Sequence, residues 1–173
     1  MKKFKSIHLM FVAVFATAAM FYLNSCVKDP CKDVVCQNGG TCLSGTCSCA
    51  TGYEGTNCET AMRDKFINAS GYSAVENGSA SGASTYTLNI TTNSNSVDKV
   101  YISNVWSTFQ NTVNATISGS TITFARQSPD NDGFYVEGNG TISGNSITVS
   151  YTVTDETSTP IVTDNVTGTW TKK

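Results

Sequence analysis

The segment NATISGSTITF at residues 114–124 recurs 25 residues later as NGTISGNSITV at residues 139–149. In each copy an apolar residue alternates with threonine, serine or another small polar residue. This period of two is typical of an antiparallel strand with one buried and one solvated face. The two copies therefore predict pairs of half-buried strands.

Each copy is interrupted by a two-residue loop that begins with glycine, at Gly119 and at Gly144. Glycine tolerates the positive φ that tight hairpin loops require. The repeat thus predicts two β-hairpins with apolar partners on one face. The expected partners are Ile117 with Ile122 and Ile142 with Ile147.

The same alternation extends through residues 60–173, where Ser, Thr and Asn make up 48 of 114 residues and no cysteine occurs. Glycosylated stalks and low-complexity linkers share this composition, but the alternation favours a folded sheet. The predicted strands are 66–76, 84–92, 98–105, 112–118, 121–126, 134–143, 146–154 and 161–171. No helical pattern intervenes, and consecutive hairpins predict an all-β domain, an antiparallel β-meander of about eight strands. Such a meander closes into a barrel or packs as a sandwich to hide its edges.

Six cysteines precede this domain, between residues 31 and 58, and sequence arithmetic leaves their pairing open. The spacing and the segments NGGTC (38–42), CSC (47–49) and GYEGTNC (52–58) resemble the EGF-like family. The resemblance implies a disulfide-rich fold with the pairs Cys31–Cys42, Cys36–Cys47 and Cys49–Cys58. A unit of this size buries too little apolar surface to fold without cross-links. A zinc site at Cys47 and Cys49 is disfavoured by the exported context. Asp29 alone cannot supply a calcium site.

The N-terminus has the pattern of an export signal. Lys2, Lys3 and Lys5 precede an apolar run from Leu9 to Leu23, too short to span a bilayer comfortably. The run ends in LNSC (residues 23–26), which resembles the lipobox of bacterial lipoproteins. The resemblance implies a signal peptide over residues 1–25 and a lipid anchor, diacylglycerol with palmitate, on Cys26. The alternative is an uncleaved N-terminal helical anchor.

The Lys-acid pair after Cys26 resembles a surface-export signal of Gram-negative lipoproteins. It implies an outer-membrane protein exposed at the cell surface, with the periplasmic face as the alternative. Cys26 is also the one cysteine that the six paired ones leave over. The predicted organisation is a signal peptide (1–25), a lipidated tether (26–30), an EGF-like domain (31–58), a linker (59–64) and a β-domain (65–173).

Charge and composition exclude several function classes. The net charge is −2, which excludes a strongly basic nucleic-acid binder. Removal of residues 1–25 lowers Lys+Arg from 11 to 8 against 13 acids, so the mature charge is −5. It also removes His8, the only histidine. The mature chain therefore cannot form a Ser-His-Asp triad, a Cys-His nucleophile pair or a histidine-ligated zinc site. The sequence therefore predicts no enzyme, no metal and no cofactor.

One acidic segment, DNDG at residues 130–133, resembles the opening of a calcium loop. The twelfth position holds Thr141 rather than a bidentate acid, so an ordinary turn is expected.

Three residues are candidate contacts for a ligand or partner. Trp106 and Phe109 lie in a polar loop, where they would stack on a sugar ring or an apolar partner, or else plug the end of a barrel. Asp164 shares the parity of Val162, Val166 and Trp170 in the last predicted strand. An inward carboxylate is costly unless it is paired, so it can mark a ligand cavity. A bulge, or a strand that begins after Asp164, is the alternative.

The layout resembles the small lipocalin-like barrels attached to bacterial surface lipoproteins, on the strand pattern and the terminal GTW at residues 168–170. We therefore expect a non-enzymatic surface lipoprotein that binds a protein or glycan partner. The alternative is a carrier with a small apolar ligand inside the β-domain. Its cavity would be lined by Tyr86, Ile147, Val149, Tyr151 and Trp170.

Overall fold

The computed structural model describes residues 28–173, so the predicted signal peptide and Cys26 lie outside the described residues. The chain forms a disulfide-rich module (residues 28–61) and a closed antiparallel barrel. The module contains two short hairpins, β1 (Thr41–Leu43) with β2 (Thr46–Ser48) and β3 (Tyr53–Glu54) with β4 (Thr60–Ala61).

The barrel is an up-and-down meander of eight strands that closes where β12 pairs with β5. The all-β prediction is confirmed, and the barrel is the form adopted. The 3₁₀ helix η1 (Met62–Phe66) connects the module to the barrel, and the 3₁₀ helix η2 (Val105–Ser107) lies in the loop between β7 and β8. The strands are β5 (Tyr72–Gly78), β6 (Gly82–Thr92), β7 (Lys99–Ser103), β8 (Val113–Ser118), β9 (Thr121–Gln127), β10 (Phe134–Ser143), β11 (Ser146–Asp155) and β12 (Val162–Lys172).

Both hairpins of the internal repeat form as predicted. Gly119 and Gly144 begin the β8–β9 and β10–β11 loops with φ of 56° and 57°, and Ile117 pairs with Ile122 as Ile142 pairs with Ile147. The prediction for the first strand is wrong over residues 66–71. Phe66 ends η1 there, and β5 begins only at Tyr72.

Phe66 is fully buried and closes the module end of the barrel, and its carbonyl oxygen accepts a hydrogen bond of 2.7 Å from the Tyr72 hydroxyl. Burial raises the pKa of Tyr72 to about 12. The predicted start of the strand is therefore a plug formed by Phe66, and the Tyr72 hydroxyl holds it to β5 by a hydrogen bond.

Apolar side chains from all eight strands fill the barrel. The predicted carrier cavity is occupied by its own lining, because Ile147, Val149, Tyr151 and Trp170 are buried in one continuous core. Burying such side chains is the main stabilising contribution, about 1.5–3 kcal/mol for each large one. The largest fully buried members are Trp170, Tyr72, Phe66, Phe124, Leu88, Ile90, Ile102, Ile122 and Ile147.

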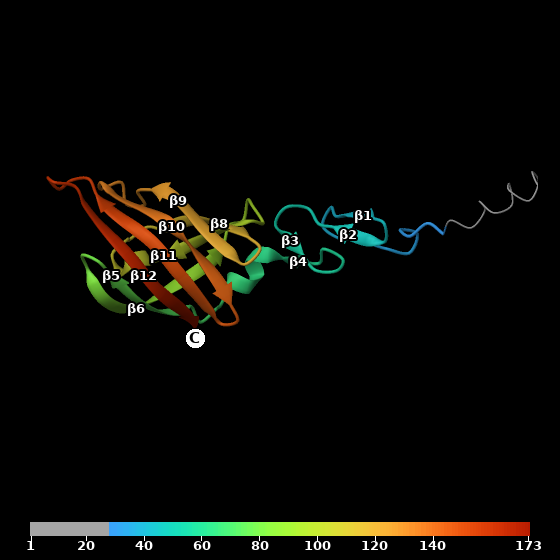
Figure 1. Cartoon of the computed structure of the whole chain (residues 1–173), viewed down its shortest axis with the longest axis horizontal. Coiled ribbons are helices and arrows are strands. Elements are labelled where there is room, and N and C mark those ends of the chain that lie inside the picture. The colour runs from blue at the N-terminus through green and yellow to red at the C-terminus, as the bar shows by residue number, and fades with distance from the viewer. Residues whose placement is uncertain (1–27) are drawn as a thin grey trace, which may run out of the picture.

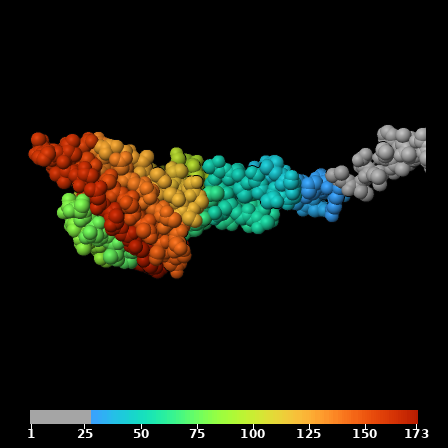
Figure 2. Space-filling view, in the orientation of Figure 1, coloured from blue at the N-terminus to red at the C-terminus, as the bar shows by residue number. Residues whose placement is uncertain are grey.

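The module joins the barrel end to end (Figure 1), and the space-filling view shows a narrow stem beside a broader head (Figure 2). The earliest described residues, in blue, lie at the end of the module farthest from the barrel. Residues 59–64, predicted as a linker, contain β4 and the start of η1. No helix within residues 28–173 is long and apolar enough to cross a membrane.

Direct contacts hold the connecting helix η1 and the module to the barrel. The Arg63 guanidinium donates hydrogen bonds to the carbonyl oxygens of Asn93 (2.7 Å) and Ser96 (2.6 Å), in the loop between β6 and β7. Gly52 has φ of +89°, and a Cβ there would lie 2.5 Å from a methyl of Val97. Glycine is therefore required where the module meets this loop.

The module itself is held by three disulfides. They join Cys31 with Cys42, Cys36 with Cys47, and Cys49 with Cys58, which are the pairs that the EGF-like resemblance implies. Within the module only Gly52 and Cys58 are buried. The module is therefore stabilised mainly by its disulfides, whereas the barrel is stabilised mainly by its hydrophobic core.

Candidate functional site

The candidate site lies at the mouth of the barrel, defined here as the end opposite the module. Four loops meet there: residues 79–81, 104–112, 128–133 and 156–161. The β11–β12 loop projects farthest from the module in Figure 1. A pocket of about 250 Å³, the mouth pocket, opens between these loops. It is lined by Ala80, Ser81, Trp106, Phe134, Val153, Asp155, Val162 and Asp164.

One wall of the mouth pocket is Trp106, in a backbone conformation unusual for this residue type. Trp106 has φ of 58°, and Asn104 and Ser107 in the same loop have φ of 60° and 56°. The left-handed region costs a bulky residue on the order of 1–3 kcal/mol, and such strain persists only where the surroundings hold it in place.

Two of the hydrogen bonds of Trp106 tie it to barrel strands. Its backbone N–H donates to the Tyr86 hydroxyl at 2.8 Å, and its indole Nε1–H donates to Asp164 Oδ2 at 3.1 Å. The loop is therefore fastened both to the barrel interior and to the wall of β12.

Asp164 is the acidic wall of the pocket and is only 3% exposed. It lies within β12 in regular register opposite Val153, so the alternative of a bulge or a later strand start is wrong. Asp164 Oδ1 accepts a hydrogen bond of 2.7 Å from the N–H of Ala80. Gly78 leaves room for this carboxylate, since a Cβ there would lie 2.4 Å from Oδ2.

Burial opposes ionisation of Asp164, but the hydrogen bonds from Ala80, Ser81 and Trp106 outweigh it and lower the pKa of Asp164. The carboxylate is thus ionised at neutral pH. The predicted inward parity applies to Val166 and Trp170 as well, but Val162 is 45% exposed, at the rim of the pocket.

The two aromatic residues predicted as contacts, Trp106 and Phe109, have different positions. Trp106 is half-buried and lines the pocket, whereas Phe109 is 4% exposed and lies in the core. The Trp106 ring centroid is 6.1 Å from that of Phe109 and 6.2 Å from that of Phe134, with tilted planes in both pairs. Phe109 therefore supports Trp106 from the core, and Phe134 stands beside it as a second aromatic wall.

Glu76, which the sequence pattern did not single out, is 3% exposed inside the barrel. Glu76 Oε2 accepts hydrogen bonds from the hydroxyls of Tyr86 (2.7 Å) and Tyr151 (2.9 Å), and Oε1 accepts one from the Trp170 indole N–H (2.6 Å). Gly168 makes room for this side chain, because a Cβ there would lie 2.6 Å from Glu76 Cγ. The buried carboxylate thus has three donors.

The two buried carboxylates are linked through Tyr86 and Trp106. Tyr86 donates to Glu76 and accepts from the Trp106 backbone, and Trp106 in turn donates to Asp164. Burial, together with the Glu76 charge, raises the pKa of Tyr86 well above its usual value. Tyr86 therefore stays protonated and can donate to Glu76. The chain of hydrogen bonds fixes the pocket wall to the core.

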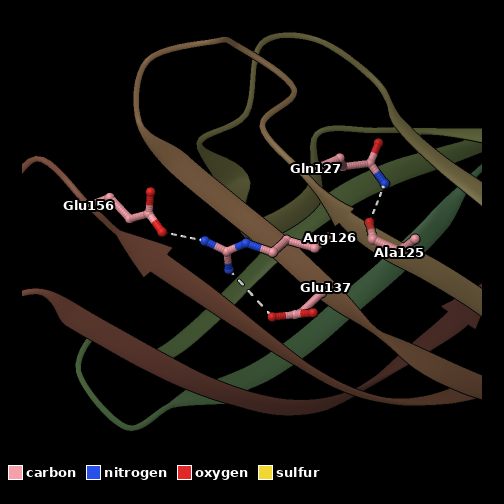
Figure 3. Close-up of polar contacts among 5 residues, drawn as sticks. All are labelled: Ala125, Arg126, Gln127, Glu137 and Glu156. Atoms are coloured by element: carbon pink, nitrogen blue, oxygen red, sulfur yellow. Dashed lines mark hydrogen bonds and ion pairs between the residues drawn. The ribbon is translucent and has the colours of Figure 1, made fainter.

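The outer wall near the mouth carries one arginine, which is already paired. Arg126 on β9 contacts Glu137 on β10 at 3.4 Å and also Glu156 after β11, as Figure 3 shows. Its guanidinium lies 4.3 Å from the Tyr135 ring centroid. Both acids and the arginine are exposed by more than a third, so the pairs are worth little in stability.

The remaining predicted sites are not part of the mouth pocket. The Asp130 carboxylate accepts hydrogen bonds from the N–H groups of Gln110 (3.0 Å) and Asn111 (2.8 Å). It thus ties the β9–β10 loop to the β7–β8 loop. In residues 28–173 no three His, Cys, Asp or Glu side chains gather as a metal site would require.

No family model matches the chain, and no solved structure does.

The chemistry of the mouth pocket is that of a small binding site. Its volume lies below the ~300–1,000 Å³ of pockets that enclose a drug-sized ligand. Its walls combine aromatic and aliphatic side chains with the carboxylates of Asp155 and Asp164. Such a pocket can take one chemical group of a larger partner, or a very small molecule.

Proposed function

We propose that this chain is a lipid-anchored surface protein of a Gram-negative bacterium that binds a partner through the mouth of its barrel, without catalysis. The order of parts along the molecule supports the proposal. The anchor would be on Cys26, the module follows, and the mouth pocket is at the opposite end of the described molecule. This arrangement would present the pocket away from the membrane.

The proposal gives the module the role of an EGF-like stem. Its disulfide pairing agrees with that family's pattern. The hydrogen bonds of Arg63 to the β6–β7 loop and the Lys65–Glu54 ion pair of 2.7 Å support a fixed rather than a loose connection. A fixed stem holds the mouth at a constant distance from the membrane.

The observation that carries the binding role is the strained Trp106 backbone over the Asp164 carboxylate. Strain of this kind is frequent at binding sites and needs support from the surrounding structure. Here the support comes from Tyr86 and, behind it, Glu76. A lipocalin-like carrier role is less well supported, because the side chains that would line its cavity are packed in the core.

The experiment is affinity capture from the native environment with the full chain and with Trp106→Ala. Thr167→Ala, an exposed change on the outer face of β12, is the matched control. We expect the wild type and the control to retain one or more partners that Trp106→Ala loses. Equal capture by all three would contradict a role for the mouth.

Protease shaving of intact and lysed cells, with Cys26→Ser in parallel, tests the anchor and the surface location. We expect the barrel to be accessible in intact cells and to be released from the membrane by Cys26→Ser. Protection in intact cells would instead favour the periplasmic face.

A further inference from the structure

We propose that the mouth pocket recognises an alkylammonium group, a positively charged amine on a short aliphatic stem. This inference rests on the proposed binding role and names the chemistry of the ligand.

The walls of the pocket have the composition that suits an organic cation. Trp106 and Phe134 present aromatic rings, whose faces attract cations. Val153 and Val162 provide apolar surface for an aliphatic stem. Asp164 places a carboxylate in the pocket as the charged partner for an ammonium group.

Asp164 has hydrogen-bond partners but no counter-ion among residues 28–173. The donors in contact with it belong to Ser79 (hydroxyl, 3.4 Å), Ala80 (N–H), Ser81 and Trp106 (indole), and all of them are neutral. The ion pairs of the described residues involve Glu54, Glu137 and Glu156 instead. A buried negative charge without a counter-ion is stabilised further when a cation binds beside it.

The rest of the mouth has the same sign of charge. The four mouth loops contain Asp130, Asp132 and Glu156 and no lysine or arginine, and Asp155 stands at the end of β11. The nearby Arg126 is already shared between Glu137 and Glu156 (Figure 3). The negative potential of these groups favours the approach of a cation over that of an anion.

Apart from Arg126, the basic residues of the chain from η1 to the C-terminus lie at the other end of the barrel. They are Arg63 and Lys65 of η1, Lys99 at the start of β7, and Lys172 and Lys173 at the C-terminus. The barrel is therefore polarised along its axis. This polarity would disfavour an anionic ligand at the mouth, whether phosphate or carboxylate.

The test uses the full chain in detergent with 5-fluorotryptophan, which gives one ¹⁹F signal each for Trp106 and Trp170, the only two tryptophans. The probes are n-butylammonium, 1-butanol and butyrate. We expect n-butylammonium to shift the Trp106 signal with a Kd on the order of 1 mM and to leave the Trp170 signal in place. The neutral and anionic probes should bind at least ~10-fold more weakly, or about 1.4 kcal/mol.

Two variants assign the effect to the pocket. Asp164→Asn removes the charge, and Glu137→Gln removes the same charge from the outer wall as the matched control. We expect Asp164→Asn to weaken n-butylammonium binding at least ~10-fold and Glu137→Gln to change it less than ~3-fold. An unshifted Trp170 signal checks that each variant is folded. If Asp164→Asn does not fold, Phe134→Leu keeps an apolar wall without the aromatic face and should also weaken binding.

A lysine tripeptide and its Nε-acetylated form distinguish the two sources of the group. Binding of the lysine peptide ~10-fold tighter than n-butylammonium would identify a protein lysine, and equal binding a free amine. No Trp106 shift with any cationic probe, or an equal shift with 1-butanol, would overturn the proposal. Partner capture that still depends on Trp106 would then preserve the binding role while removing this ligand chemistry.

Discussion

The module and the barrel reach a fixed structure by different means. Residues 28–61 bury almost nothing beyond Gly52 and Cys58 and depend on three disulfides. The barrel has no cysteine and depends on a continuous core and two satisfied buried carboxylates. Covalent cross-links therefore determine the structure of the module, whereas side-chain packing determines that of the barrel.

The largest expected effect is that of reducing the disulfides, which should destabilise the module but not the barrel. Each disulfide contributes about 2–4 kcal/mol, so a reductant should unfold the module and leave the barrel folded. Limited proteolysis with a broad-specificity protease should then cut within residues 28–61 and spare residues 72–172. A cleavage pattern unchanged by reductant would show that the module has another source of stability.

The next effect concerns the polar centre of the barrel. Glu76→Gln replaces a charged acceptor of three hydrogen bonds by a neutral amide, and we expect the free energy of unfolding to fall by about 1–3 kcal/mol. Glu137→Gln on the exposed outer wall should change it by less than about 0.5 kcal/mol. Urea denaturation with the disulfides intact measures both, and equal values for the two variants would contradict the role of Glu76.

A smaller effect is expected where the two regions meet. Arg63→Met removes the hydrogen bonds to Asn93 and Ser96 and should lower the free energy of unfolding by about 1–2 kcal/mol. Amide hydrogen exchange in the 93–98 loop should become faster, while the disulfides stay intact. Lys65→Met is the control, because its partly exposed ion pair with Glu54 is worth about 0–1 kcal/mol. Unchanged exchange in Arg63→Met would argue for a loosely joined stem.

The smallest effect is the dependence on pH. The folded pKa of Asp164 is below its unfolded value of about 3.9. Its stabilisation is therefore complete above that value and is lost as pH falls through the folded pKa. The stability difference between wild type and Asp164→Asn should be greatest near neutral pH and shrink toward pH 3. Urea denaturation at both pH values measures this, and a difference independent of pH would show that ionisation of Asp164 does not matter.

The repeat predicted its own register because a hairpin with one buried face has a single acceptable pairing. The start of the first strand was not predictable in the same way, since Phe66 and Ile67 fit a strand as well as a plug. Parity placed Asp164 inside, yet only the β7–β8 loop, whose backbone no sequence pattern describes, brings Trp106 onto it.

Glu76 was missed for a different reason. In β5 the charged residue faces inward, and the adjacent Val75 is 57% exposed. These two positions alone suggest the opposite face, although Glu76 shares the parity of Tyr72 and Ala74, which are buried. The donors that make this acceptable come from β6, β11 and β12, far away in the sequence. Local patterning can place Glu76 inward by parity, but it does not show which residues donate hydrogen bonds to it.

The Glu76 site also has a consequence for how the barrel assembles. Tyr151 and Trp170 are 75 and 94 residues away from Glu76 in the chain, so their hydrogen bonds can form only once β12 closes against β5. Before closure the Glu76 carboxylate is hydrated, so it carries no desolvation penalty. If the barrel closed with β12 shifted by one residue, the carboxylate would be buried without its full set of donors, at a cost of several kcal/mol. Glu76 thus destabilises a barrel closed in the wrong register without destabilising the open chain.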